Sequence, residues 1–300
     1  MKEQSTALNP ALHPEGSVKQ SYSYWKQACG HFKHNKSVLF ALCFLFVLLL
    51  GAILIPCFSE RTYYDMHLYL KNSPPGRMFW LGSDELGRDI FTRIWWGARI
   101  SLFVGISAAV IDMIIGVFYG GLGGMIGGRV EELMMRVSDV LYSLPHLLIV
   151  ILLMVSMKPG IAAIIASLTI TGWVNMARIV RGQILQIKQS DFVMAAHLLG
   201  ASKWRILTRH LLANSIGSII TTMTFTIPTA IFSEAFLSFL GLGVQAPMAS
   251  WGTMASDGLP ALRYYPWRLF FPACFITLTI LAFNLVGNGL RDAFDPRLRK

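Results

Sequence analysis

Six long apolar stretches, separated by polar segments, follow one another along the 300-residue chain. A transmembrane α-helix needs about 20 mostly apolar residues to cross a hydrocarbon core roughly 30 Å thick. The stretches that approach or meet this length cover residues 37–57, 99–121, 140–157, 161–180, 215–240 and 267–290. The pattern therefore predicts an all-α fold, that of a polytopic membrane protein with six transmembrane helices.

The same pattern divides the chain into five parts. They are an N-terminal tail at 1–36, a first transmembrane helix at 37–57, a mixed segment at 58–98, a five-helix core at 99–290 and a C-terminal tail at 291–300. Within the core, a polar loop at 181–214 separates the fourth span from the fifth. Because six crossings return the chain to the side on which it began, both tails are predicted to lie on the same side of the membrane.

Charge supports this interpretation and gives it an orientation. Hydrophobic residues make up 54% of the chain and charged residues 14%, whereas soluble domains carry about 25% charged residues. The side that holds both tails and the loops at 122–139 and 181–214 is the richer in Lys and Arg. By the positive-inside rule that side is cytoplasmic, and the segment at 58–98 is extracytoplasmic. The formal charge of +10 is thereby explained without a nucleic-acid partner.

The loop contains a stretch at 190–214, SDFVMAAHLLGASKWRILTRHLLAN, that is too polar to span a membrane. The side chain of Ser190 or Asp191 can cap a short helix, because a side-chain oxygen accepts from the amides of a first helical turn. Gly200 is suited to end that helix, since glycine adopts the left-handed backbone of a helix stop. Ser202 can then cap a second helix. The sequence predicts two short helices with a break at the glycine.

Two features of this stretch indicate a docking element. Ala195 and Ala196 lie just before the glycine turn and have almost no side chain, so another surface can approach the backbone closely. In the second helix, Trp204, Leu207 and Leu211 are spaced to share one apolar face. We therefore expect a small protruding surface at the glycine turn, followed by a second helix whose apolar face packs against the rest of the protein.

Glycine recurs at every fourth position near the end of the second span. Gly116, Gly120, Gly124 and Gly128 are expected to form a groove along one helical face, where a neighbouring helix packs closely. A phosphate-binding loop is excluded because no GxxxxGK[ST] motif is present in the chain. We expect neither an ATPase site nor a bound cofactor in this chain.

Two carboxylic acids, Asp112 and Glu234, lie within predicted spans. An ionisable group at this depth costs about 2.5 to 3.5 kcal/mol on insertion scales and usually faces a cavity or a partner. Both are therefore candidates for the translocation path, and the alternative is that each is hydrogen-bonded to another helix. Both acids would also suit a secondary transporter that is coupled to protons or ions.

No motif indicates a metal site or a catalytic centre. The four cysteines form no CxxC pair and have no histidine at metal-binding spacing; they are Cys29, Cys43, Cys57 and Cys274. A hydrolase that uses Ser143 or Ser107 with His146 would lack the usual GxSxG and HExxH motifs. In the run at 81–89, Asp84, Arg88 and Asp89 are expected to hold capped turns, because the spacing of a calcium loop is missing.

Several blocks of the sequence resemble the permeases of ATP-binding-cassette (ABC) importers. The stretch DFVMAAHLLGASKWRILTRHLLAN is similar to the cytoplasmic "EAA" loop of that family, in which an acidic-Ala-Ala triplet and a glycine dock into an ATPase subunit. Other blocks resemble the second (C-type) permease subunit of dipeptide and oligopeptide importers: LGSDELGRDIFTRIWWGARISL, GWVNMARIVRGQIL, EAFLSFLGLGVQAPMASWG and LRDAFDPRL. The resemblance implies the type I ABC importer permease fold in the bacterial cytoplasmic (inner) membrane.

By this resemblance, the loop couples the chain to a separate ATPase. The residues assigned to coupling are Asp191, Met194, Ala195, Ala196, Gly200, Ala201, Lys203 and Arg205. Two positions depart from the family's pattern: the glutamate expected before the two alanines is Met194, and the proline expected near the end of the loop is Ala213. Without the charge of the glutamate, we expect a more apolar contact with the ATPase.

The resemblance also implies the rest of the assembly. A permease of this kind pairs with a second permease subunit as a heterodimer and binds two ATPase subunits, which hold ATP and Mg²⁺. It receives its cargo from an extracytoplasmic peptide-binding protein. The chain is then a transporter subunit and not an enzyme, and it forms half of the translocation pathway. Dipeptides, oligopeptides and nickel chelates all remain open as cargo.

Overall fold

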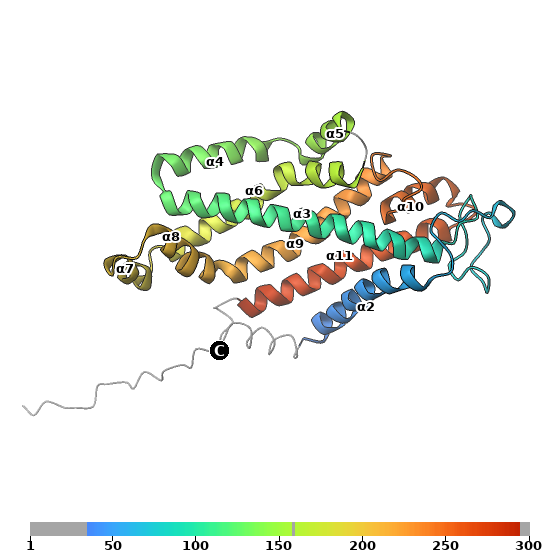
Figure 1. The fold of residues 1–300 in the computed structure, drawn as a ribbon, viewed down its shortest axis with the longest axis horizontal. Coiled ribbons are helices and arrows are strands. Elements are labelled where there is room, and N and C mark those ends of the chain that lie inside the picture. Colours follow the sequence, from blue (N-terminus) through green and yellow to red (C-terminus); the bar gives the residue numbers. More distant parts are fainter. Residues whose placement is uncertain (1–34, 158–159, 295–300) are drawn as a thin grey trace, which may run out of the picture.

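The computed structural model describes residues 35–157 and 160–294, and every regular element in those ranges is a helix. Five of these helices are long and apolar enough to cross a membrane. They are α2 (Lys36–Phe58), α3 (Ile90–Ile126), α6 (Ile161–Ile187), α9 (Leu212–Phe239), which continues a run that starts at Lys203, and α11 (Trp267–Phe294). They run along the long axis of the molecule (Figure 1). The all-α, multi-span prediction is confirmed.

The third predicted span, 140–157, is wrong as a single straight helix. The structure has two helices there, α4 (Gly128–Ser143) and α5 (His146–Ser156), bent by 80° at their junction. Pro145 causes the break, because a proline ring disfavours helical backbone in the residue before it, and Leu144 is extended. Counted as one crossing, this bent pair brings the number of candidate spans in the described residues to six.

Helix α3 is longer at both ends than the predicted span at 99–121. Its start is fixed by Asp89, whose carboxylate accepts from the backbone N–H groups of Phe91 (3.2 Å) and Thr92 (3.3 Å). Its end is fixed by Gly127, which adopts a positive φ of 74°. The apolar run does not reveal the first turns of the helix, because Thr92 and Arg93 interrupt it before residue 99.

Three glycines near the end of α3 lie against α6, and these two helices form the most extensive pair in the described chain. At Gly116, Gly120 and Gly124, an added Cβ would collide with α6; at Gly120 it would meet the backbone of Ala177. Gly128 does not belong to this row, which corrects the prediction. It lies beyond the end of α3 with a φ of 61°, and no atom would lie near its Cβ.

Opposite ends of the bundle carry different structures. The segment at 59–89 and α10 (Trp251–Gly258) lie at one end, which we call the α10 end; α7 (Asp191–Leu198) and α8 (Lys203–Ile206) lie at the other, the α7 end (Figure 1). The predicted tails at 1–36 and 291–300 lie largely outside the described residues.

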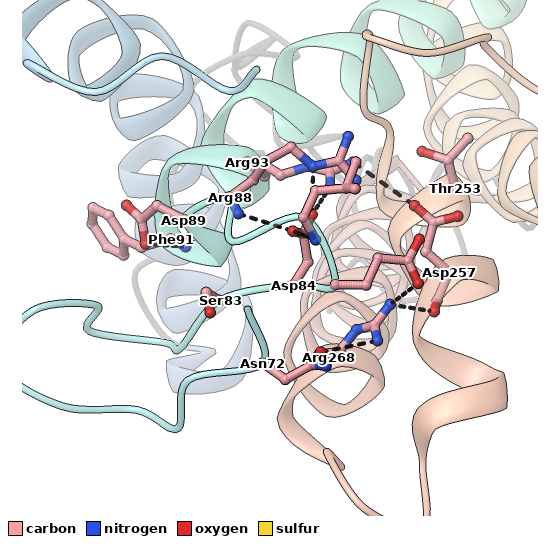
Figure 2. Close-up of polar contacts among 12 residues, drawn as sticks. Asn72, Ser83, Asp84, Arg88, Asp89, Phe91, Arg93, Thr253, Asp257 and Arg268 are labelled. Carbon is pink, nitrogen blue, oxygen red and sulfur yellow. Dashed lines mark hydrogen bonds and ion pairs between the residues drawn. The ribbon is translucent and has the colours of Figure 1, made fainter. Parts of the chain in front are cut away.

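A buried network of ion pairs holds the α10 end together (Figure 2). Asp84 accepts from the backbone N–H groups of Leu86 and Arg88, each at 2.9 Å, and its other oxygen accepts from the guanidinium groups of Arg88 and Arg93. The capped turn predicted for this run is confirmed. Burial raises the pKa of Asp84, but the positive charges of Arg93 and Arg88 outweigh burial and hold the pKa below its usual value.

A third arginine, Arg268, extends this network to α11. Arg268 donates to the side chain of Asn72 at 3.2 Å, to Glu85 at 3.1 Å and to the backbone carbonyl of Asp257 at 2.8 Å (Figure 2). These contacts join the segment at 59–89 to both α10 and α11. A long segment, regular only in the short 3-10 helix at Leu68–Leu70, is thereby fixed across the end of the bundle.

Candidate functional site

The structure forms the two predicted short helices, α7 and α8, at the α7 end. Gly200 ends α7 with a φ of 83°, and the N–H of Ala201 donates to the carbonyl of Ala196 at 3.0 Å, which closes a glycine-type helix stop. Ser202 caps α8 through the N–H of Arg205 at 3.3 Å. Ser190 occupies the cap position of α7, but its hydroxyl donates to the carbonyl of Ile187 instead. We call residues 190–211 the α7–α8 hairpin.

Buried side chains fix the hairpin to the bundle. Val193, Ile206, Leu207 and Leu211 are buried in one cluster with residues of α6 and α9. The predicted apolar face is wrong at Trp204, whose side chain is 62% exposed. A π-helical turn at Leu207–Leu211 explains the difference, because its wider turn changes which residues share a face.

Lys188 provides a further anchor just before the hairpin. Its ammonium group donates to the backbone carbonyl of Met125 at 2.8 Å, near the end of α3. A lysine at a helix C-terminus satisfies carbonyl groups that have no partner within the helix. The hairpin is therefore connected to α3 and α6, the most extensive helix pair of the bundle.

Helix α7 presents large apolar side chains to its surroundings, although it lies outside the candidate membrane spans. Phe192, Met194, Leu198 and Leu199 are exposed, the last two by 82% and 88%. We call these four residues the α7 surface. An exposed apolar patch outside lipid usually marks an interaction site.

The eight residues predicted to couple to an ATPase all lie on this hairpin. Six of them are exposed: Asp191, Met194, Ala195, Gly200, Lys203 and Arg205. Ala196 and Ala201 are half-buried. No atom would lie within contact distance of a Cβ at Gly200. Open space and small side chains at the glycine turn leave the backbone accessible to another surface.

A cavity of about 810 Å³ lies between α3, the break between α4 and α5, α6 and α9. Asp112 of α3 lines this cavity, and only 4% of its surface is exposed. Its Oδ1 atom is shielded from solvent and has no hydrogen-bond partner among the residues that the structure describes. Gly172 of α6 faces this carboxylate, and a Cβ at that position would collide with it.

Neutral polar groups make up much of the remaining wall. The Nδ1 atom of His146 lies 2.6 Å from the hydroxyl of Thr171. From α9, Thr222, Thr226 and Thr229 line the cavity. These threonines were not among the predicted site residues. The available signal was their recurrence at helical spacing within an otherwise apolar span.

The second predicted acid, Glu234, does not line this cavity. Its side chain is fully buried, and its two oxygens accept from the hydroxyls of Ser101 (2.9 Å) and Ser238 (2.8 Å). Ser238 in turn lies 3.3 Å from the hydroxyl of Ser250. Glu234 thus joins α3 and α9 to the start of α10, and the structure places it in helix packing.

Two family models match this chain. The model for "Binding-protein-dependent transport system inner membrane component" matches residues 112–300, and the model for "N-terminal TM domain of oligopeptide transport permease C" matches residues 23–75. One match contains the α7–α8 hairpin and most of the cavity, and the other contains α2. A solved structure, "Crystal structure of an amino acid ABC transporter with histidines", is 18% identical with a TM-score of 0.49 and covers 64% of this chain and 89% of that chain.

Curated relatives match nearly the whole chain. It is 56% identical to the oligopeptide transport system permease protein OppC of Bacillus subtilis (strain 168), over 94% of this chain and 92% of the relative. It is also 56% identical to the dipeptide transport system permease protein DppC of the same organism, over 95% and 89%. The OppC protein of Escherichia coli (strain K12) is 40% identical over 92% of each chain. With its five or six candidate spans, the chain belongs to the family of binding-protein-dependent transport system inner membrane components.

Proposed function

We propose that this chain is the membrane-spanning permease subunit of an ATP-driven, binding-protein-dependent importer of dipeptides or oligopeptides. The identity to OppC and DppC over nearly the whole chain supports peptides as the cargo class. The cavity between α3, α6 and α9 is the proposed portion of the translocation path that this subunit contributes. The chain itself has no enzymatic role in this proposal.

The exposed α7 surface is the observation that carries the coupling role. A membrane permease that binds no nucleotide needs a contact through which ATP hydrolysis elsewhere moves its helices. The α7–α8 hairpin offers an apolar contact outside the spans and is anchored to α3 and α6 through Lys188 and its buried cluster. We propose that an ATPase subunit, with its ATP and Mg²⁺, docks here. Met194, where the family has glutamate, then makes this contact apolar.

The proposed assembly follows from this contact. The α7 end faces the cytoplasm of a bacterial cell, in agreement with the positive-inside rule, and the chain spans its cytoplasmic membrane. A second permease subunit completes the pathway, two ATPase subunits bind at the α7 end, and a peptide-binding protein delivers cargo to the α10 end. The proton- or ion-coupled alternative has no support from the relatives, which are permease subunits of peptide transport systems.

Copurification tests the docking role. The chain, its ATPase and the second permease subunit are coexpressed, and the ATPase recovered with the chain is measured after detergent extraction. Leu198→Asp places a charge on the α7 surface and is expected to lower recovery about 10-fold or more. Leu262→Asp is the matched control, because Leu262 is 45% exposed and follows α10 at the opposite end. Equal recovery with Leu198→Asp and with the unchanged chain would refute docking at α7.

A further inference from the structure

The cavity contains one carboxyl group and one guanidinium group among the described residues that line it, those of Asp112 and Arg291. The other titratable lining residues are His146, which pairs with Thr171, and Tyr142. Among the described residues, none donates a hydrogen bond to Asp112 and none forms an ion pair with it.

An acid in this state is costly to keep. A buried polar group without a hydrogen bond loses its hydration and gains nothing in return. Glu234 shows the usual solution in the same molecule, because two serine hydroxyls satisfy it. Asp112 has no such neighbours: its carboxylate packs directly against the backbone of α6 at Gly172, where any side chain would collide with it, and it lines the cavity. The missing partner is therefore expected to come from outside the chain.

We propose that Asp112 binds the free α-ammonium group of a peptide during its passage through the cavity. This inference rests on the proposed function as a peptide permease. An ammonium group supplies the positive charge and the N–H donors that the carboxylate lacks. Every unmodified peptide carries this group whatever its side chains, so a single acid can serve cargo of varied sequence. The charge of Arg291 has the sign that suits the carboxylate at the other end of the peptide.

The threonines of α9 suit a peptide backbone. The hydroxyls of Thr222, Thr226 and Thr229 donate to carbonyls of their own helix at 2.7 to 3.0 Å. Their donor hydrogens are used in this way, while their oxygen lone pairs can still accept from a peptide N–H. Neutral acceptors of this kind hold the cargo without selecting its side chains, which leaves the two charged ends of the peptide as the points of charged recognition.

The first test uses the unchanged importer, complete with both permease subunits and both ATPases but without its binding protein. Equilibrium dialysis compares a radiolabelled dipeptide with its N-acetylated form. The free dipeptide is expected to bind about 10-fold more tightly or better, which is the usual effect of a hydrogen bond to a charged group. Equal binding of the two, or no binding of the free dipeptide at millimolar concentration, would overturn the proposal.

The second test uses Asp112→Asn, which keeps the shape of the side chain and removes its charge. The variant is expected to lose the preference for the free amino group and to lower uptake into proteoliposomes about 10-fold. ATP hydrolysis stimulated by the loaded binding protein should persist, which would show that the variant is folded and assembled with its ATPase subunits. Uptake by the variant at the unchanged rate would overturn the role of Asp112.

The outcomes separate this inference from the proposed function. If the unchanged importer shows no ATP-dependent uptake, the proposed function fails. If it transports peptide but Asp112→Asn does so equally well, only the ammonium contact fails. Uptake by the unchanged importer that stops when a proton gradient is collapsed would assign Asp112 to proton coupling and would also overturn the inference.

Discussion

Asp84 shows how a single buried carboxylate stabilises a long loop. It binds two guanidinium groups and two backbone amides, and its pKa is lowered because Arg93 and Arg88 outweigh the effect of burial. A carboxylate whose pKa is lower in the folded state contributes stability above its unfolded pKa of about 3.9. That contribution is lost as pH falls through the folded pKa.

Asp84→Asn is expected to lower the free energy of unfolding by about 3 kcal/mol at neutral pH, because two buried guanidinium groups lose their shared carboxylate. Thermal unfolding of the detergent-solubilised protein measures this difference as a function of pH. The difference should stay constant from about pH 8 to pH 5 and shrink below about pH 4.

Glu85→Gln is the matched control for this measurement. Glu85 pairs with Arg268, but its side chain is 56% exposed, so its removal should cost less than about 1 kcal/mol. A difference between Asp84→Asn and the unchanged protein that grows on acidification would contradict the assigned role of Asp84.

Asp112 and Glu234 mark the limit of inference from sequence at the residue scale. Both stand at membrane depth in the sequence, and neither hydropathy nor spacing indicates which has partners. The three serines that surround Glu234 lie on α3, on α9 and just before α10, so only the folded chain brings them together. The same fold leaves Asp112 alone at a cavity.

At the scale of helices, the contact between α3 and α6 depends on the absence of side chains at three glycines. Gly120→Ala would place a methyl group against the backbone of Ala177, which cannot move like a flexible side chain. We expect the free energy of unfolding to fall by about 1–3 kcal/mol, the usual cost of overpacking. Thermal unfolding in detergent measures it.

Gly182→Ala is the matched control for the glycine prediction. Gly182 lies in α6, and a Cβ there would meet no atom within contact distance. Because alanine is the better helix former, this substitution should be neutral or stabilising by up to about 1 kcal/mol. A larger loss of stability for Gly182→Ala than for Gly120→Ala would show that the helix contact is misplaced.

The helices were largely predictable from the sequence, and the errors in their predicted bounds have physical causes. Apolar runs located α2, α6, α9 and α11 to within several residues, because lipid-facing helices must be apolar. The start of α3 was missed because Thr92 and Arg93 interrupt the apolar run just after the cap at Asp89. The 80° bend between α4 and α5 could not be predicted, since Pro145 indicates a break but the direction after a break depends on packing.

At the scale of the whole molecule, the proposed topology places the α7 end in the cytoplasm and the α10 end on the opposite side of the membrane. In a background with all four cysteines replaced by serine, Leu199→Cys and Tyr69→Cys provide one accessible thiol at each end, where these side chains are 88% and 80% exposed. A membrane-impermeant maleimide added to intact cells should label only Tyr69→Cys, and both variants should be labelled after the membrane is opened. Labelling of Leu199→Cys in intact cells would show that the α7 end lies outside the cell and would contradict the proposed topology.

The two-helix hairpin shows how far sequence reasoning reached toward function. The glycine stop and the Ser202 cap were predicted from local chemistry and are confirmed. Exposure of the α7 surface was not predictable, because Phe192, Met194, Leu198 and Leu199 are as apolar as buried residues and only the fold leaves them uncovered. The partner that covers them stays a proposal.

ATP-driven uptake of a radiolabelled dipeptide is the most direct test of the proposed role in peptide import. The chain is reconstituted into proteoliposomes with a second permease subunit, two ATPases and the loaded peptide-binding protein. We predict uptake that requires ATP and the binding protein, and that continues when an ionophore collapses the proton gradient. Uptake that proceeds without ATP and stops with the ionophore would contradict the account and would identify an ion-coupled transporter.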